Sequence, residues 1–228
     1  MLDLFGTLVD APTATDRRVA AERLAAAAGA QTDEVESYLI ESWQRRHDGT
    51  LPTVEAVAAD LIDAVHGAPS AAGQIAGELT DLGRERIVRV DASVIGVLAL
   101  LRSAGLRIGI LTDAAPEIAA AWQARPLAPT VDAVVFSSTF GATKPNAGLY
   151  QHLLAALRAS APEALYCGDG GGSELDGAAA LGMRVVRVRR RGPRDALAFG
   201  QGQWNGPVID SVEQLPVFLG LGLETTTG

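Results

Sequence analysis

The chain has 228 residues but only one cysteine, Cys167, and three histidines. A single cysteine excludes an intramolecular disulfide and a metal site built from several thiolates, and a reducing, cytoplasmic compartment is the simplest expectation. The histidines, His47, His66 and His152, are scattered without metal-ligand spacing, so we interpret them as structural. Aromatic residues contribute only 5% of a composition that is 48% hydrophobic and 20% charged. Such a composition is typical of a globular protein and not of a disordered one.

Basic residues are outnumbered, since 19 Lys and Arg face 27 Asp and Glu for a formal net charge of -8. This balance argues against a nucleic acid or an anionic membrane as the main partner. The longest apolar stretch, residues 94–111, is interrupted by Arg102 and Arg107, which argues against a membrane span. Asp3 and the lack of a basic region before an apolar run argue against a signal peptide. We expect a small-molecule substrate, no nucleic-acid or membrane partner, and a monomer or homodimer.

Helical periodicity dominates residues 13–86, and short β-branched runs alternate with helices after residue 91. This alternation predicts a parallel sheet with helices on both faces. We therefore predict an α/β fold: a three-layer Rossmann-like core of residues 1–12 and 90–228, with an inserted α-helical domain of residues 13–89. The expected helices are 14–28, 33–46, 52–65, 71–86, 92–104, 116–125, 148–159, 174–181 and 211–219. The expected strands, after a short first one at the N-terminus, are 106–111, 133–137, 164–167, 184–188 and 208–209.

Four polar clusters fall at the carboxyl ends of expected strands, where ligands bind in sheets of this kind. The clusters are far apart in sequence but would converge at one edge of a parallel sheet. That convergence is the main functional signal in the chain. The clusters are Asp3, Thr112 with Asp113, Lys144, and Asp169 with Glu174.

Four sequence motifs occupy these positions. They are DLFGTLVD from Asp3, ILT ending at Thr112, KP from Lys144, and GDGGGSELDGA from Gly168. In their order, spacing and strand context they resemble the four motifs of the haloacid dehalogenase-like (HAD) hydrolase superfamily, over nearly the whole chain. The helical insertion resembles the helical cap that closes over the site in that family.

The resemblance implies a hydrolase with a role for each motif. Asp3 would be the nucleophile and would form a covalent aspartyl intermediate. Thr112 would bind the transferred group through its hydroxyl and the neighbouring amides. Asp113 beside it is either a loop cap or a polar wall of the pocket. Lys144 would neutralise charge on the nucleophile and on the transferring group.

Magnesium is the cofactor that the resemblance implies, held by Asp3, Asp169, Glu174 and the backbone carbonyl of Phe5. The residue chemistry supports a cation independently, because three carboxylates beside one lysine leave an excess of negative charge that raises their pKa values unless a cation lies among them. Oxygen ligands without a histidine or cysteine cluster suit Mg²⁺ rather than zinc. Glu174 stands where the family usually has aspartate and, being one methylene longer, could hold the metal through water.

Phe5 departs from the phosphatases of the family, which usually carry a general acid/base aspartate two residues after the nucleophile. Phe5 cannot donate or accept a proton. The reaction rate would therefore fall least for substrates whose leaving group needs no proton, such as those that release a halide, and for acyl and aryl phosphates. The family's dehalogenases also carry an aromatic residue there, yet they work without a metal and lack this fourth motif. We favour a Mg²⁺-dependent phosphatase of a small phosphorylated metabolite. A carbon–halogen hydrolase and a catalytically weak binding or regulatory protein on the same scaffold stay open.

Two further expectations concern the cap and the N-terminus. Arg45 and Arg46 follow Trp43 on an expected cap helix, and either could form a fork for an anionic substrate. Only Met1 and Leu2 precede Asp3, whereas the nucleophile's strand in the family usually has four or five apolar residues before the aspartate. We therefore expect the native chain to begin earlier than Met1.

Overall fold

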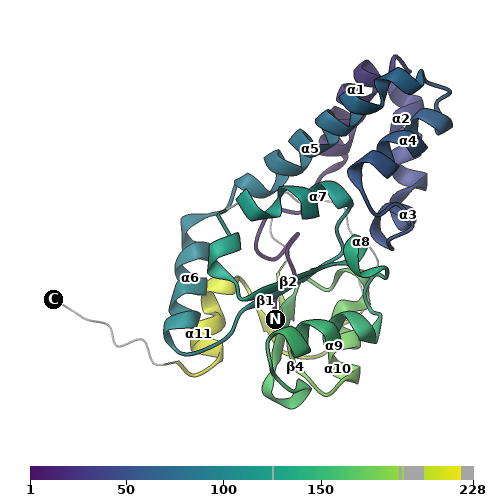
Figure 1. Cartoon of the computed structure of the whole chain (residues 1–228). Coiled ribbons are helices and arrows are strands. Elements are labelled where there is room, and N and C mark those ends of the chain that lie inside the picture. The colour runs from purple at the N-terminus through teal and green to yellow at the C-terminus, as the bar shows by residue number, and fades with distance from the viewer. Residues whose placement is uncertain (125, 190–191, 193–202, 222–228) are drawn as a thin grey trace.

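A parallel sheet forms the centre of the molecule (Figure 1). The computed structural model describes residues 1–124, 126–189, 192 and 203–221. Strands β1 and β2 pair with each other, and β3, β4 and β5 pair in that order, always in parallel, as predicted. The strands are β1 (Gly109–Thr112), β2 (Ala133–Phe136), β3 (Leu165–Gly168), β4 (Arg184–Val188) and β5 (Val208–Ile209).

The N-terminal segment joins the two parts of this sheet. Leu2 forms parallel bridges to Ile110 of β1 and to Cys167 of β3. Its amide donates to the Gly109 carbonyl over 2.8 Å. On the other side, the Asp3 amide donates to the Cys167 carbonyl over 3.0 Å. The order across the sheet is therefore β2, β1, Leu2, β3, β4, β5, and Asp3 leaves the sheet at its carboxyl edge between β1 and β3.

Helices cover both faces of the sheet (Figure 1). Ile110 packs into the apolar cluster of one face and Leu111 into that of the other, because successive strand residues point to opposite sides. The first cluster includes buried residues of α6 and α11, and the second includes those of α9 and α10. Three layers therefore form around one sheet, as predicted. These helices are α6 (Ala92–Ser103), α9 (Ala147–Ala156), α10 (Glu174–Ala180) and α11 (Leu215–Phe218).

Five helices between the N-terminal segment and α6 form a bundle that projects from the sheet, and we call this bundle the cap (Figure 1). The cap has its own apolar cluster, whose buried members all lie within residues 20–79. Its first helix begins at a capping box, in which the side chains of Thr13 and Asp16 each accept from the other residue's backbone amide. The insertion of a helical domain is thus confirmed, and its limits at 13–89 stay a prediction. The helices are α1 (Ala14–Ala28), α2 (Thr32–Glu41), α3 (Trp43–His47), α4 (Val54–Ala64) and α5 (Ala72–Val88).

Two short helices lie between the cap and the carboxyl edge of the sheet, α7 (Pro116–Ala121) and α8 (Ser137–Phe140). The long helix α5 packs directly against α7. A Cβ added at Gly83 of α5 would lie 2.4 Å from the carbonyl oxygen of Glu117, so this contact requires glycine. Short 3₁₀ turns span Pro69–Ala71, Trp122–Ala124, Ala128–Thr130, Ala161–Glu163, Gly171–Ser173 and Val212–Gln214.

Three cap helices differ from their predicted extents, and α5 does so by running on to Val88. The helix expected at 33–46 is broken at Ser42, whose hydroxyl accepts from the Arg46 side chain. The proline Pro52 does not open α4, because Thr53 caps that helix by accepting from a backbone amide inside it. A side-chain hydrogen bond, which the apolar periodicity does not report, accounts for the cap of α4.

Several core elements also differ from their predicted bounds. The helices expected at 116–125 and 148–159 end earlier, at Ala121 and Ala156. The strand expected at 106–111 begins only at Gly109, since the amide of Ile108 donates to the side chain of Asp132 at 2.7 Å and not to a neighbouring strand. Ser137, expected in a strand, begins α8 instead. In the described part of the chain, none of the helices combines the length and the apolar character that crossing a membrane requires.

Candidate active site

A buried lysine links two carboxylates at the carboxyl edge of the sheet. Lys144 Nζ lies 2.7 Å from Asp3 Oδ1 and 2.6 Å from Glu174 Oε2. All three side chains are almost fully buried. Burial acts to lower the pKa of Lys144, but the neighbouring carboxylates outweigh it and hold that pKa well above its ordinary value. The lysine therefore stays charged beside Asp3.

Glu174, the first residue of α10, accepts three hydrogen bonds from the protein. Its Oε2 accepts from Lys144 and from the Tyr166 hydroxyl at 2.8 Å, and its Oε1 accepts from the Gly170 amide at 2.9 Å. A Cβ added at Gly168 would lie 2.1 Å from Oε1, so glycine at the end of β3 makes room for this carboxylate. Burial, followed by the charge of Asp3, raises the pKa of Glu174 from 4.5 to about 7.

Asp3 is held on both oxygens, because Thr7 donates to Oδ2 at 3.0 Å while Lys144 donates to Oδ1. Burial raises the pKa of Asp3, the charge of Lys144 acts against this, and the charge of Asp169 adds to it. Asp169 follows β3, and its Oδ1 accepts from the Gly171 amide at 2.9 Å. One ammonium thus faces several buried carboxylates, and negative charge is in excess.

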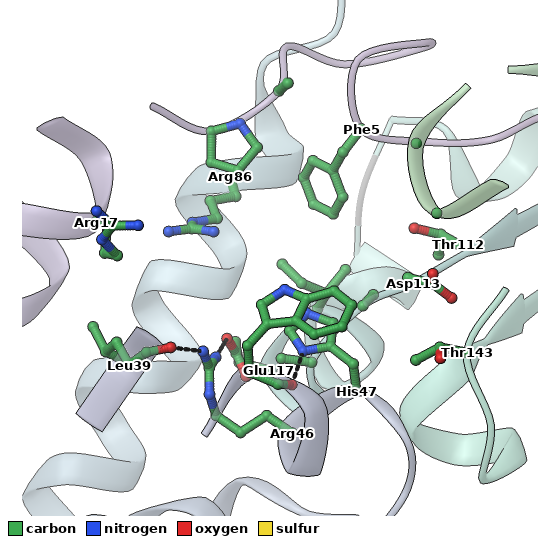
Figure 2. A pocket seen from close by; sticks show the side chains of 18 of the residues that line it. Phe5, Arg17, Leu39, Arg46, His47, Arg86, Thr112, Asp113, Glu117 and Thr143 are labelled. Atoms are coloured by element: carbon green, nitrogen blue, oxygen red, sulfur yellow. Dashed lines mark hydrogen bonds and ion pairs between the residues drawn. The ribbon is translucent and has the colours of Figure 1, made fainter. Parts of the chain in front are cut away.

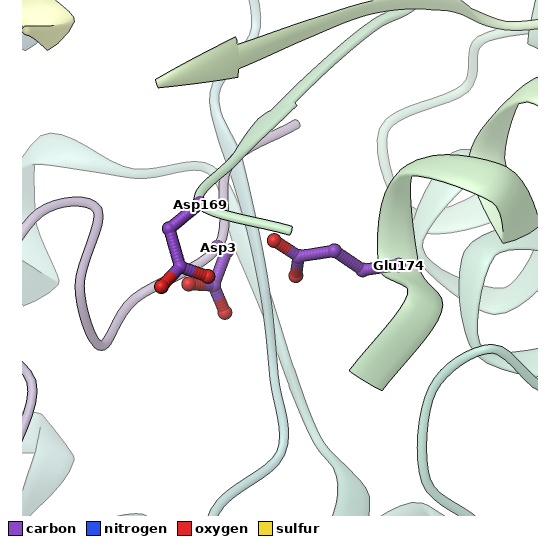
Figure 3. A group of neighbouring side chains, drawn as sticks. All are labelled: Asp3, Asp169 and Glu174. Atoms are coloured by element: carbon purple, nitrogen blue, oxygen red, sulfur yellow. The ribbon is translucent and has the colours of Figure 1, made fainter. Parts of the chain in front are cut away.

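The carboxylates of Asp3, Asp169 and Glu174 each offer an oxygen within 4.8 Å of the others (Figure 3). The oxygen donors and the excess of negative charge fit a hard divalent cation such as Mg²⁺. In Figure 3 the groups of Asp3 and Asp169 lie side by side, while Glu174 reaches toward them from α10. Because Glu174 already accepts three hydrogen bonds, it is better suited to orient Lys144 than to bind a cation directly. The backbone carbonyl of Phe5 as a further ligand stays a prediction.

Thr112 and Asp113 lie beside this group, as the sequence predicted. Thr112 ends β1, is buried, and its hydroxyl has no hydrogen-bond partner within the described residues. Asp113 accepts from the backbone amide of Lys144 at 3.0 Å and so holds the loop that carries the lysine. Burial raises the pKa of Asp113. An unpartnered hydroxyl at the wall of a cavity is available to a ligand.

A cavity of about 520 Å³ extends from these residues to the cap. Asp3, Thr112 and Asp169 line its core end, and Phe5, two residues after Asp3, forms part of its wall (Figure 2). The cap end is lined by apolar side chains and by three arginines. The apolar residues include Leu24, Leu39, Trp43, Leu79, Leu82 and Ile118, and the arginines are Arg17, Arg46 and Arg86.

The structure separates the two arginines that the sequence singled out. Arg45 is exposed, pairs with Asp60 at 2.5 Å, and is not among the described residues that line the cavity. Arg46 is buried and lines the cavity, but its guanidinium donates to Ser42 Oγ. It also donates to the Leu39 carbonyl, as Figure 2 shows. The Arg46 guanidinium is therefore held mainly by the cap itself.

Sequence reasoning missed two of the cavity's arginines, Arg17 of α1 and Arg86 of α5. Nothing in the local pattern distinguishes Arg86 from Arg84 or Arg89, because the face of α5 that meets the cavity is set by its packing. Glu117 was missed for the same reason. It is buried at the first turn of α7, with Oε1 4.0 Å from Arg46.

Comparisons with known proteins identify the class. The family model for haloacid dehalogenase-like hydrolases matches residues 1–182, so the chain belongs to that family and is a hydrolase of this class. A comparison with curated proteins found no match.

Solved structures of both phosphatases and dehalogenases have this fold. A 2-haloacid dehalogenase from Pseudomonas syringae pv. Tomato aligns with a TM-score of 0.69 at 20% identity, covering 96% of each chain. A HAD phosphatase from Thermococcus onnurineus aligns with a TM-score of 0.64 at 20% identity, also over 96% of each chain. An L-2-haloacid dehalogenase from Xanthobacter autotrophicus aligns with a TM-score of 0.62 at 19% identity, over 97% of this chain and 98% of that one. These likenesses concern the fold and do not distinguish between the two reactions.

Proposed function

We propose that this hydrolase is a cytoplasmic, Mg²⁺-dependent phosphatase of a small phosphorylated metabolite, with Asp3 as its nucleophile. The observation that carries the proposal is the carboxylate of Asp169 next to that of Asp3, with Glu174 close to both. An anionic phosphoryl group can approach such a cluster only if further positive charge joins Lys144. Asp3 and Asp169 would hold Mg²⁺, whose chemistry there would be to supply that positive charge.

Side chains of the protein carry out the remaining catalytic steps. A carboxylate oxygen of Asp3 attacks phosphorus, the bond from phosphorus to the leaving oxygen breaks, and an aspartyl phosphate forms. Lys144 offsets negative charge on the attacking carboxylate and on the transferring group. The Thr112 hydroxyl, which lacks a partner among the described residues, donates to a phosphoryl oxygen. Water then attacks phosphorus, which releases phosphate and regenerates Asp3.

Phe5 narrows the range of leaving groups. It lines the cavity two residues after the nucleophile and cannot give a proton to a departing alkoxide. Acyl phosphates and aryl phosphates leave as stabilised anions and need no such proton. We therefore place the substrate in one of these two classes.

A carbon–halogen hydrolase is the second candidate, and Phe5 with the apolar lining of the cavity favours it. Asp3 would then attack carbon and displace halide, and water would hydrolyse the resulting ester. The adjacent carboxylates of Asp113 and Asp169 oppose this alternative, because they would repel the carboxylate of a haloacid. A binding or regulatory protein without turnover is the third candidate.

The first experiment is the hydrolysis of acetyl phosphate with and without Mg²⁺, in parallel with halide release from 2-chloropropionate. We expect phosphate release that requires Mg²⁺ and is lost in Asp3→Asn. Asp176→Asn is the matched control, because Asp176 is an exposed acid on α10 and should leave the rate unchanged. Halide release without metal would favour the dehalogenase. Absence of both reactions, together with ligand binding that survives Asp3→Asn, would favour the binding protein.

A further inference from the structure

The two ends of the cavity carry opposite charge. The core end gathers the carboxylates of Asp3, Asp113 and Asp169 around one lysine. The cap end carries the three arginines, in a chain whose overall formal charge is -8. In Figure 2 the guanidinium groups of Arg17 and Arg86 lie on the side of the cavity away from Thr112 and Asp113. A substrate that fills the cavity meets both ends.

Only one of the three cap arginines is fully engaged by the protein. Arg46 donates to Ser42 Oγ at 2.9 Å and to the Leu39 carbonyl at 2.7 Å. Its remaining Nη1 lies 4.0 Å from Glu117 Oε1. The opposite charges of Arg46 and Glu117 offset each other, and the pair joins the cap to α7.

Arg17 and Arg86 are different. Among the described residues, the Arg17 side chain pairs only with Glu36, through a long hydrogen bond of 3.4 Å from Nε, and this acid also pairs with Arg18. Arg86 is half-buried and makes no hydrogen bond or ion pair to any residue of the described ranges. Burial acts to raise the pKa of the nearby Asp16, but hydrogen bonds from Thr13 and, to a smaller extent, the charge of Arg86 outweigh it and lower that pKa. The Oδ2 of Asp16 accepts from Thr13 and not from Arg86.

An unpaired guanidinium at an apolar cavity wall loses hydration without gaining a partner, and an incoming oxyanion offsets that loss. A guanidinium presents its N–H groups as a planar fork that matches a carboxylate. Arg86 and Arg17 both line the cavity, and their guanidinium groups lie on the same side of it in Figure 2. Most of the other side chains that line the cavity are apolar, which suits an apolar body in the substrate.

We infer that Arg86, assisted by Arg17, binds a carboxylate at the far end of the substrate from the phosphoryl group. The inference rests on the proposed function and specifies its substrate class: an aryl or acyl phosphate with an apolar body and a distal carboxylate. Arg86 and Arg17 are then specificity-determining residues and take no part in the bond-breaking steps.

The test compares 4-carboxyphenyl phosphate with its neutral analogue, 4-carbamoylphenyl phosphate, in Mg²⁺. We expect kcat/KM to favour the carboxylate at least tenfold in the unmodified protein, mostly through KM. Arg86→Gln should abolish that preference, Arg86→Lys should restore part of it, and Arg17→Gln should reduce it. Arg84→Gln is the matched control, because Arg84 is exposed on the same helix and pairs with Asp81. Its preference should equal that of the unmodified protein.

Calorimetric titration of both probes into Asp3→Asn protein separates this inference from the proposed function. If neither probe is hydrolysed but the carboxylate probe binds at least tenfold tighter, and Arg86→Gln in the same background removes the difference, the carboxylate site stands and the phosphatase proposal is wrong. If hydrolysis occurs and the preference is absent, or persists in Arg86→Gln, the inference is overturned. Failure of both probes to bind also overturns it.

Discussion

His47 provides a pH-dependent test of how the cap is built. Its ring stacks on Trp43 with centroids 4.4 Å apart, and its Nδ1 lies 2.6 Å from the Trp43 carbonyl. A carbonyl only accepts, so Nδ1 carries the proton of a neutral imidazole. Burial, followed by the charge of Arg46, lowers the pKa of His47 from 6.5 to about 3. The folded protein therefore holds this histidine neutral throughout mildly acidic conditions.

The sign of the effect follows from proton binding. Below pH 6.5 His47 is protonated in the unfolded chain, whereas in the folded protein it is protonated only below about pH 3. The stabilisation that comes from the neutral form is thus complete above pH 6.5 and is lost as the pH falls toward 3. One proton corresponds to roughly 1.4 kcal/mol per pH unit. Between about pH 7.5 and 4.5 the loss is about 3 kcal/mol of unfolding free energy.

The assay is urea unfolding followed by far-ultraviolet circular dichroism, in metal-free buffers across that range. His47→Gln should be less stable than the unmodified protein near neutrality, because it loses the stack on Trp43. That deficit should shrink by about 3 kcal/mol toward pH 4.5, since the variant has no proton to take up at this position. His152→Gln, at an exposed position on α9, controls for the loss of an imidazole. Parallel pH profiles for His47→Gln and the unmodified protein would refute the reasoning.

Two further changes test the site and the join between the cap and the core. Phe5→Asp places a carboxyl group, which can donate a proton, at a position on the cavity wall where Phe5 cannot. We expect the turnover of alkyl phosphates to rise by about 10²–10⁴-fold, while the turnover of acetyl phosphate changes little. An equal change for both substrates would contradict the role given to Phe5. Gly83→Ala puts a Cβ 2.4 Å from the Glu117 carbonyl oxygen and should cost about 1–3 kcal/mol in urea unfolding, whereas Gly77→Ala on the same helix, where no atom lies within 4 Å, should be neutral or stabilising.

Local patterns predicted most of the elements. The helix expected at 14–28 and the strand expected at 184–188 have the predicted bounds, because a capping box, a closing glycine and a short β-branched run are all local signals. The break at Ser42 was missed, because Val35, Leu39 and Trp43 continue the apolar spacing across it. That spacing carries no information about the hydrogen bond from the buried Arg46 side chain to the Ser42 hydroxyl.

The candidate site also contains residues that the sequence predicted and residues that only the tertiary structure identified. The sequence alone determined that acids and a lysine follow successive parallel strands, and the topology brings Asp3, Lys144 and Glu174 into contact because those strand ends share one edge. Only the tertiary structure decided which arginines line the cavity. Arg45 turns to Asp60, while Arg86 is directed to the cavity by the packing of α5 on α7. The face of a helix that meets a second domain depends on contacts between residues far apart in the chain, and no local pattern contains them.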